Sequence, residues 1–203
     1  MTARVGADPR PRIGVFGGTF DPPHLGHLLL AEAARDRLAL DRVLFVPARI
    51  PPHKRGRRVT PPAIRLALLR AALAGTGFSV STLELDRPGP SYTVDTLERL
   101  GARHPRARFW LLVGADSLAE LPTWRDPERI LALARLAVAD RPGAAPPPPS
   151  LRHHARRVVH LGNSPVQIAS SDVRRRVARG RSIRFLVPAA VERRVRALGL
   201  YRR

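Results

Sequence analysis

Eleven residues near the start of the chain, 17–27, combine residue types and spacings that suit an anion; they read GGTFDPPHLGH. The pair Gly17-Gly18 lets the backbone turn tightly and approach a ligand with no Cβ in the way. His24 and His27 are one helical turn apart, which puts two imidazole groups on one face. Together these features indicate that the stretch binds phosphate.

The segments on either side are expected to position this stretch. The apolar run 13–16 is typical of a buried parallel strand, and residues 25–38 are typical of a helix. A helix that begins after the glycines aims free N–H groups and a partial positive charge at them, which favours an anion. The glycine spacing matches neither the dinucleotide motif GxGxxG nor a P-loop.

A basic side chain follows the second expected strand. Lys54, in the sequence PPHK, is the only lysine in the chain. Two interpretations carry equal weight: a mobile point charge that closes over phosphates, or one lysine left by chance in an arginine-biased composition.

Three polar or aromatic groups are expected near the carboxyl edge of the sheet. Residues 91–97, SYTVDTL, begin a helix, and their hydroxyl and carboxyl groups could serve only as helix caps. Asp116 follows the most apolar run, 109–113, and open α/β sheets bind ligands where such strands end. Trp124, eight residues on, is either a lid on the core or a surface on which an aromatic ring stacks.

The sequence IASSDVR, residues 168–174, has the form of a helix N-terminus. Ser170 or Ser171 is expected to cap the helix, with Arg174 projecting from its first turn. A capped helix with a solvated arginine needs no ligand, whereas N–H groups beside a guanidinium could form a second phosphate site. The histidine stretch makes the phosphate interpretation the better one.

Strands and helices alternate along the chain. This predicts an α/β fold with a Rossmann-like, doubly wound parallel sheet, helices on both faces and a small helical C-terminal part. Thr60 is expected to cap a helix that starts at Pro61. The other expected strands are 12–16, 43–46, 78–85, 136–139 and 157–161, and the other expected helices are 60–73, 127–134, 171–179 and 189–198.

Composition narrows the class of protein. The chain has no Cys and no apolar run of membrane-spanning length, from which we expect a soluble, cytoplasmic protein without a membrane partner. The net charge is +20, but aromatic residues make up only 5%, which argues against a dedicated nucleic-acid surface. A positive field would still attract small polyanions. Residues 1–11 are expected to form a flexible tail, and 142–156 a Pro-rich exposed connection.

The ordered set of motifs resembles a known family. GGTFDPPHLGH, PPHK, SYTVDTL, GADSL with TW, and IASSDVR together are similar to bacterial nicotinate-nucleotide adenylyltransferases, which belong to the nucleotidyltransferases with an HxGH signature. The resemblance runs from about residue 13 to 201. It implies one nucleotidyltransferase domain over 12–203, with a helical C-terminal part at 168–203. It also implies transfer of AMP from ATP to nicotinate mononucleotide, giving deamido-NAD and pyrophosphate in NAD biosynthesis.

The resemblance also assigns roles by motif position. The catalytic residues would be His24, His27, Lys54 and Arg174. The ATP site would comprise Gly17, Gly18, Thr19, Phe20, His24, Gly26, His27, Ile168, Ser171 and Arg174. The mononucleotide site would comprise Lys54, Thr93, Asp116, Trp124 and Arg125, the last through its main chain. Mg²⁺ would be held mainly by phosphates and water, with no protein metal site.

Other functions stay open at this point. An enzyme of the same fold could transfer a nucleotidyl group to nicotinamide mononucleotide or phosphopantetheine instead. A non-catalytic nucleotide- or RNA-binding protein would use the charge without turnover. A zinc site at His24 and His27 lacks a third and fourth ligand. The sequence leaves open whether the chain forms a homo-oligomer.

Overall fold

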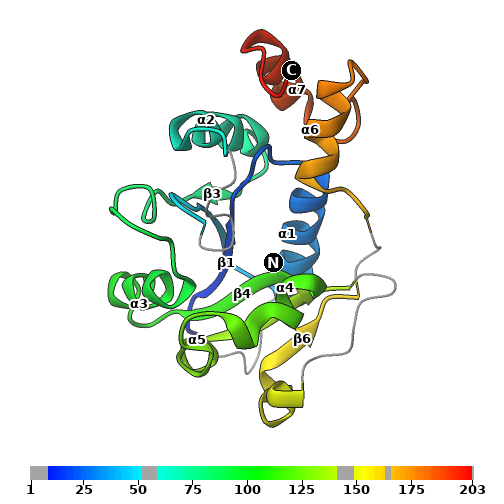
Figure 1. The fold of residues 1–203 in the computed structure, drawn as a ribbon. Coiled ribbons are helices and arrows are strands. Elements are labelled where there is room, and N and C mark those ends of the chain that lie inside the picture. Colours follow the sequence, from blue (N-terminus) through cyan, green and yellow to red (C-terminus); the bar gives the residue numbers. More distant parts are fainter. Residues whose placement is uncertain (1–8, 52–58, 141–148, 163–165, 203) are drawn as a thin grey trace.

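A computed structural model describes residues 9–51, 59–140, 149–162 and 166–202 of the chain. Within them, six parallel strands form one sheet in the order β3-β2-β1-β4-β5-β6 (Figure 1). The strands are β1 (Arg12–Gly18), β2 (Arg42–Pro47), β3 (Ser79–Val80), β4 (Arg108–Gly114), β5 (Ala134–Ala139) and β6 (Val158–His160). This order confirms the doubly wound sheet that the alternating pattern predicts.

Helices connect the strands and cover both faces of the sheet. The α-helices are α1 (Leu25–Leu38), α2 (Pro62–Leu73), α3 (Thr93–Arg103), α4 (Ala115–Glu120), α5 (Pro127–Leu133), α6 (Ser170–Ala178) and α7 (Ala189–Ala197). Two 3-10 helices, η2 (Leu121–Thr123) and η3 (Pro149–Arg157), complete the described elements. No helix in the described part of the chain is both long enough and apolar enough to cross a bilayer.

Alternate residues of the central strands enter two separate cores. Val15 and Leu111 join the core under α3 and α5, whereas Phe16 and Leu112 join the core under α1 and α2. Because helices cover both faces, successive residues of each central strand are buried. This burial on both faces of the sheet explains the continuous apolar runs from which the strands were predicted.

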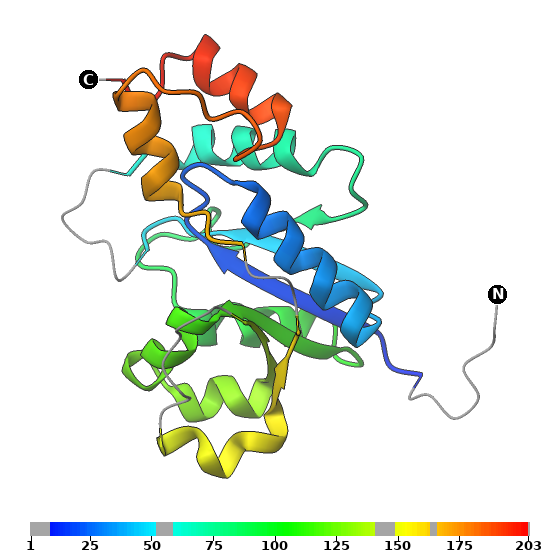
Figure 2. The same cartoon turned by 90° about the vertical axis from the view of Figure 1, so that its right-hand side faces the viewer.

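A third core belongs to the C-terminal part of the chain. Helices α6 and α7 pack against the outer side of α2 through a set of aliphatic side chains (Figure 2). Its buried members are Leu68, Ala72, Val173, Ile183, Val187, Val191 and Val195. The C-terminal part is therefore fixed to the helix that follows β2, at the same end of the sheet as the glycine-rich stretch.

Two predictions about these elements were wrong, and one helix was not anticipated. The strand expected over 78–85 ends at Val80, because the chain turns where the Asp86 N–H bonds to the Thr82 carbonyl at 3.0 Å. Thr60 does not cap α2, because the helix begins only at Pro62 and its N-cap is Pro61. Helix α4, which follows β4 directly, was not anticipated.

The connection expected over 142–156 is described only from residue 149. There it forms the 3-10 helix η3, in which Leu151 is buried and Ala155 and Arg156 are exposed. Residues 142–148 lie outside the described residues, as do residues 1–8 of the expected tail.

A fully buried arginine on α2 joins the loops at the carboxyl edge of the sheet. Arg65 donates to the carbonyls of Thr60 and Thr19 at 2.8 Å each, from Nε and Nη1. Its Nη2 donates to the carbonyls of Ala48 and Arg49 at 2.7 and 3.2 Å. The sequence offered one signal for it, since Arg65 shares a helix face with buried leucines three and four residues on.

We predict that Arg65→Met lowers the free energy of unfolding by roughly 3–5 kcal/mol, because it leaves buried carbonyls without donors and the buried Asp21 carboxylate without its positive partner. Arg70→Met, on the exposed side of the same helix, is the matched control and should change it by less than about 0.5 kcal/mol. Urea denaturation measures both. Equal effects of the two substitutions would contradict the bracing role of Arg65.

Candidate active site

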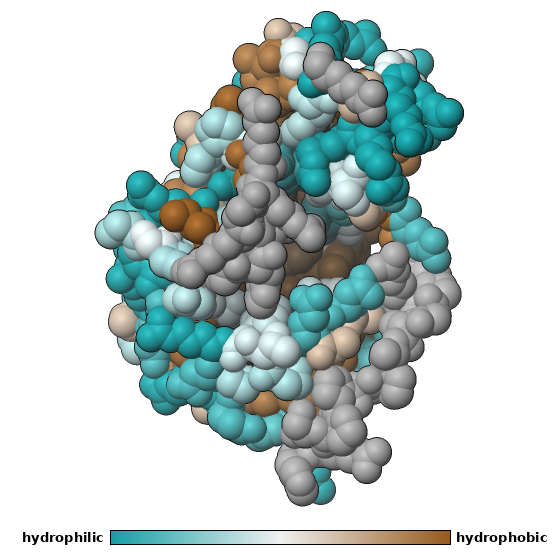
Figure 3. Space-filling view, in the orientation of Figure 1, coloured by the Kyte–Doolittle hydropathy of each residue, from teal (hydrophilic) through white to brown (hydrophobic). Residues whose placement is uncertain are grey.

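The site lies at the carboxyl ends of β1 and β4. The chain leaves β1 toward β2 on one side, and β4 pairs with β1 on the other, so the strand order reverses between them. Loops part at such a point and leave a crevice, which is where open α/β sheets bind ligands. In the space-filling view, apolar atoms lie in a hollow near the middle of this face, with hydrophilic atoms around it (Figure 3).

Two cavities of about 370 and 430 Å³ meet along this edge. They share Phe16, Gly17, Gly114 and Ser117 as lining residues. The larger cavity contains the two histidines and the residues before α6, and we call it the histidine cavity. The smaller contains Trp124 and the start of α3, and we call it the tryptophan cavity. Two ligands bound side by side would therefore meet near Gly17.

The two histidines of the histidine cavity hold each other in place. His24 is the N-cap of α1, and its backbone N–H donates to Nδ1 of His27 at 3.1 Å. Their rings stack with centroids 3.6 Å apart. A Cβ at Gly26 would lie 3.1 Å from Nδ1 of His24, and one at Gly18 would lie 2.9 Å from the Phe20 ring. The glycines of the motif thus make room for aromatic rings as well as for a ligand.

Phe20 supports the histidine pair by packing against the ring of His27. Its backbone has a positive φ of 49°, which is uncommon for a residue with a side chain, and its ring is buried. The ring centroid lies 5.0 Å from that of His27 and 5.7 Å from that of Phe16. The apolar contact fixes the orientation of the His27 imidazole.

His24 is held in its neutral form. Burial lowers its pKa from 6.5 to about 4, opposed in part by the negative charge of Asp172. Within the described residues its Nδ1 is buried and has no hydrogen-bond partner. At neutral pH, His24 can therefore supply a hydrogen bond but no net charge. Positive charge for phosphates must therefore come from other groups, such as Arg174 and the N-termini of helices.

The start of α6 lies beside the histidines, as predicted, but its cap was predicted wrongly. Ala169 is the N-cap, and neither serine caps the helix with its side chain. Ser170 instead donates from Oγ to the Pro22 carbonyl at 2.9 Å, because the helix packs against the 17–27 stretch. Ser171 is exposed on the first turn.

Two further predicted ATP-site residues lie close by. Ile168 lines the histidine cavity. Arg174 donates from Nη1 to the Asp21 carbonyl at 2.6 Å and so stands next to the phosphate loop. Asp116, on the first turn of α4, lines the same cavity from its other side.

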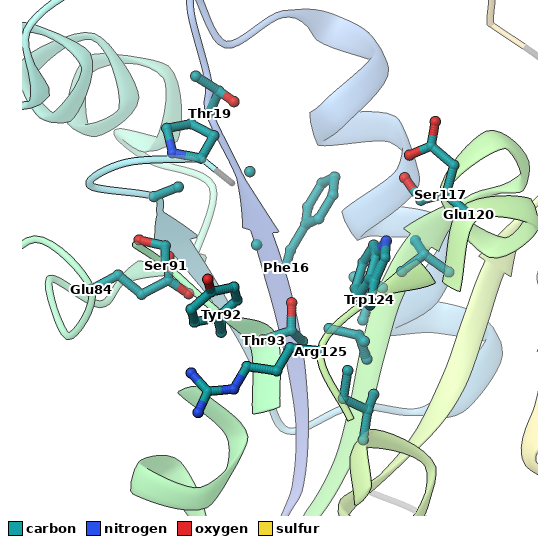
Figure 4. A pocket seen from close by; sticks show the side chains of 18 of the residues that line it. Phe16, Thr19, Glu84, Ser91, Tyr92, Thr93, Ser117, Glu120, Trp124 and Arg125 are labelled. Carbon is teal, nitrogen blue, oxygen red and sulfur yellow. The ribbon is translucent and has the colours of Figure 1, made fainter. Parts of the chain in front are cut away.

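Three of the predicted mononucleotide residues, Thr93, Trp124 and Arg125, line the tryptophan cavity (Figure 4). Asp116, which was predicted with them, lines the histidine cavity instead. Thr93 is the first residue of α3, and Trp124 follows η2. The guanidinium of Arg125 lies 4.8 Å from the ring centroid of Tyr92. In the part of the chain that the structure describes, the backbone N–H of Arg125 makes no hydrogen bond. An acceptor such as a carboxylate could bind there.

Lys54 lies outside the described residues, as do Pro52 and His53 of the PPHK loop, whereas Pro51 lines the tryptophan cavity. Conversely, no sequence pattern pointed to Glu84, a buried carboxyl group on the wall of the tryptophan cavity. Thr96 donates from Oγ1 to Glu84 Oε1 at 2.6 Å, and burial raises the pKa of Glu84. A carboxyl group kept closer to neutral repels an anionic ligand less than an ionised one would.

We predict that His24 makes stability depend on pH. Because its pKa is about 4 when folded and about 6.5 when unfolded, the unfolded state binds more protons between these values. The free energy of unfolding should therefore fall on acidification through this window, by on the order of 3 kcal/mol. In the His24→Asn variant, the fall in the free energy of unfolding on acidification, measured by urea denaturation, should be smaller by that amount. The same pH slope in both proteins would show that His24 titrates normally.

Comparisons with known proteins agree with this geometry. Residues 15–176 match the model of the cytidylyltransferase-like family. A Thermomicrobium roseum protein named probable nicotinate-nucleotide adenylyltransferase is 49% identical over 94% of this chain and 92% of its own. A protein of the same name from a Roseiflexus species is 48% identical over 94% and 98%.

Solved structures show the same fold. Plasmodium falciparum nicotinic acid mononucleotide adenylyltransferase complexed with NaAD superposes with a TM-score of 0.78 at 15% identity, over 94% of this chain and 97% of that one. The same enzyme complexed with APC gives a TM-score of 0.76 at 14% identity, with the same coverage of each chain. The chain therefore belongs to the cytidylyltransferase-like family and, within it, to the nicotinate-nucleotide adenylyltransferases.

Proposed function

We propose that the protein transfers AMP from ATP to nicotinate mononucleotide, releasing pyrophosphate and forming deamido-NAD for NAD biosynthesis. One observation carries the proposal furthest: the two cavities meet at Phe16, Gly17, Gly114 and Ser117. The histidine cavity suits the triphosphate, and the tryptophan cavity suits an aromatic mononucleotide. The relatives that share nearly the whole chain carry the name of this activity.

The chemistry needs positioning more than it needs a base. The 5′-phosphate of the mononucleotide is already anionic, so its oxygen attacks the α-phosphorus of ATP directly. As this P–O bond forms, the bond from the α-phosphorus to the bridging oxygen breaks, and pyrophosphate leaves in line. Such transfers depend on alignment of the reacting groups and on neutralisation of charge.

Each group in the histidine cavity has a part in this. His24 and His27 donate hydrogen bonds to the ATP phosphates. Because His24 is neutral, its hydrogen bond adds no positive charge to the site. Arg174 adds a positive charge at the phosphate loop, and the start of α6 adds free N–H groups. Lys54 would add a second cation from its loop.

Mg²⁺ fits the site as a companion of ATP. The metal prefers phosphate oxygens and water, and Asp116 offers a carboxylate on the wall of the histidine cavity. Bound to the triphosphate, it would neutralise charge on the leaving pyrophosphate.

In the tryptophan cavity, Trp124 stacks on the pyridine ring of the mononucleotide. The N–H of Arg125 and the hydroxyl of Thr93 receive its carboxylate. The guanidinium of Arg125, held on the face of Tyr92, adds a favourable charge nearby. These groups favour the acid over the amide.

Pyrophosphate release by the purified protein, with ATP and Mg²⁺, tests the proposal. We expect kcat/KM for nicotinate mononucleotide to exceed that for nicotinamide mononucleotide at least ten-fold, because the amide leaves the donors for a carboxylate poorly paired. A preference for the amide, or turnover only with phosphopantetheine, would reject the proposed substrate. Salt-sensitive RNA binding without any turnover would reject the activity.

We predict that His27→Ala lowers kcat about 10²–10³-fold while the fold persists, because the imidazole stabilises phosphate charge that develops in the transition state. Circular dichroism reports the fold. His104→Ala, at the end of α3, is the control and should keep kcat within two-fold. Wild-type turnover in His27→Ala would remove His27 from the mechanism.

We predict that Trp124→Ala raises KM for the mononucleotide about ten-fold or more, since stacking of a base on an aromatic ring contributes roughly 1–3 kcal/mol. KM for ATP should stay within two-fold, because Trp124 lines only the tryptophan cavity of the two. Steady-state kinetics with each substrate varied separates the effects. Equal increases in both KM values would exclude the stacking role.

A further inference from the structure

Asp21 is a buried carboxylate in the middle of the phosphate-binding stretch. Its side chain is only 3% exposed and does not line either cavity. Oδ2 accepts a hydrogen bond from the Thr60 N–H at 3.2 Å, and its charge raises the pKa of Arg65 against the lowering that burial causes. Asp21 therefore contacts its partners on the side of the phosphate-binding stretch that faces away from the two cavities.

The second partner of Asp21 comes from the far end of the chain. The Tyr201 hydroxyl donates to Asp21 Oδ1 at 2.7 Å, across 180 residues of sequence. Burial and the adjacent carboxylate both raise the pKa of Tyr201, so the phenol remains protonated and can donate at any physiological pH. Its ring packs against the core formed by α2, α6 and α7.

Three more hydrogen bonds tie this C-terminal part to the same stretch. Ser170 donates to the Pro22 carbonyl, and Arg174 donates to the Asp21 carbonyl. The Leu25 N–H, at the start of α1, donates to the Leu186 carbonyl at 2.9 Å. All three involve the backbone of the stretch, whereas Tyr201 reaches a side chain that also bonds to the α2 loop.

We propose that Tyr201 is a positioning residue for the transfer reaction. Through Asp21, its hydroxyl sets the placement of residues 17–27, so that Gly17, His24 and His27 face the phosphates in the reactive arrangement. The expected effect of Tyr201 on kcat rests on the proposed function. Its expected effect on the placement of residues 17–27 does not. A loop held 1 Å away from the reactive arrangement can reduce a rate 100-fold.

The test compares Tyr201→Phe with a matched control, Glu192→Gln. Tyr201→Phe removes one oxygen and keeps the ring in its core. Glu192→Gln breaks a polar contact with Arg196 on α7 of the same C-terminal part, remote from the stretch. At a temperature at which circular dichroism shows both variants to be folded, we expect kcat to fall at least ten-fold in Tyr201→Phe and by less than two-fold in Glu192→Gln.

A double-mutant cycle identifies the route of the effect. If Tyr201 acts through Asp21, then Asp21→Asn combined with Tyr201→Phe should lower kcat much less than the product of the two single losses. If the loss of kcat in the double variant equals the product of the two single losses, the proposal is overturned. The same holds for a Tyr201→Phe variant that melts earlier yet keeps the wild-type kcat, since a purely stabilising contact behaves in that way.

Hydrogen exchange separates failure of this inference from failure of the proposed function. Without any nucleotide, amides of residues 17–27 should exchange at least five-fold faster in Tyr201→Phe than in wild type or Glu192→Gln. Amides of α7 should be unchanged. If the wild-type protein shows no turnover, hydrogen exchange still tests the positioning role of Tyr201. Unchanged exchange of 17–27, or equal acceleration in α7, would overturn the positioning role.

Discussion

Four backbone carbonyls at the carboxyl edge of the sheet accept hydrogen bonds from one guanidinium, that of Arg65. Burying such a charge costs free energy unless it is hydrogen-bonded and paired. Here carbonyls supply the hydrogen bonds, and the buried carboxylate of Asp21 supplies the opposite charge. These bonds join the backbones of the loops after β1 and β2 to the start of α2, so this polar centre fixes their relative positions. The ligand cleft depends on those positions.

The cleft must bring together two anionic substrates, and its groups divide that task. Neutral His24 offers a hydrogen bond where a charge would be costly to bury. Arg174 and the start of α6 supply positive potential at the rim, where solvent lowers the cost. The net charge of +20 on the whole chain adds a field that attracts both substrates. In the tryptophan cavity, where we propose that the mononucleotide binds, burial raises the pKa of Glu84 and so reduces the repulsion that this carboxyl group exerts on an anionic ligand.

The sequence predicted the parts of this protein that depend on local pattern. Buried parallel strands leave continuous apolar runs, and the order of strands and helices predicted the doubly wound sheet. The histidine pair followed from helical spacing, and Asp116 followed from its position after an apolar strand, whereas Thr93 and Trp124 were assigned from the resemblance to a family. All of them line the cleft.

What the sequence did not predict depends on contacts between distant segments. The contacts of Arg65 and the bond between Asp21 and Tyr201 join residues far apart in the chain. Helical spacing places Arg65 on a buried face, but no local pattern identifies the partners of either residue. The wrong cap at α6 has the same origin, because the hydroxyl of Ser170 is used by a tertiary contact with Pro22. Local capping rules describe what a helix end can do alone, and packing then decides which partner it takes.

A crystal structure of the protein with a non-hydrolysable ATP analogue and nicotinate mononucleotide would test the central claim most directly. We expect the triphosphate to lie in the histidine cavity, within hydrogen-bond distance of His24 and His27. We expect the pyridine ring to lie on Trp124, its carboxylate at the Arg125 N–H, and the 5′-phosphate near Gly17 in line with the α-phosphorus. Nucleotides bound in exchanged cavities, or a mononucleotide phosphate remote from Gly17, would contradict it.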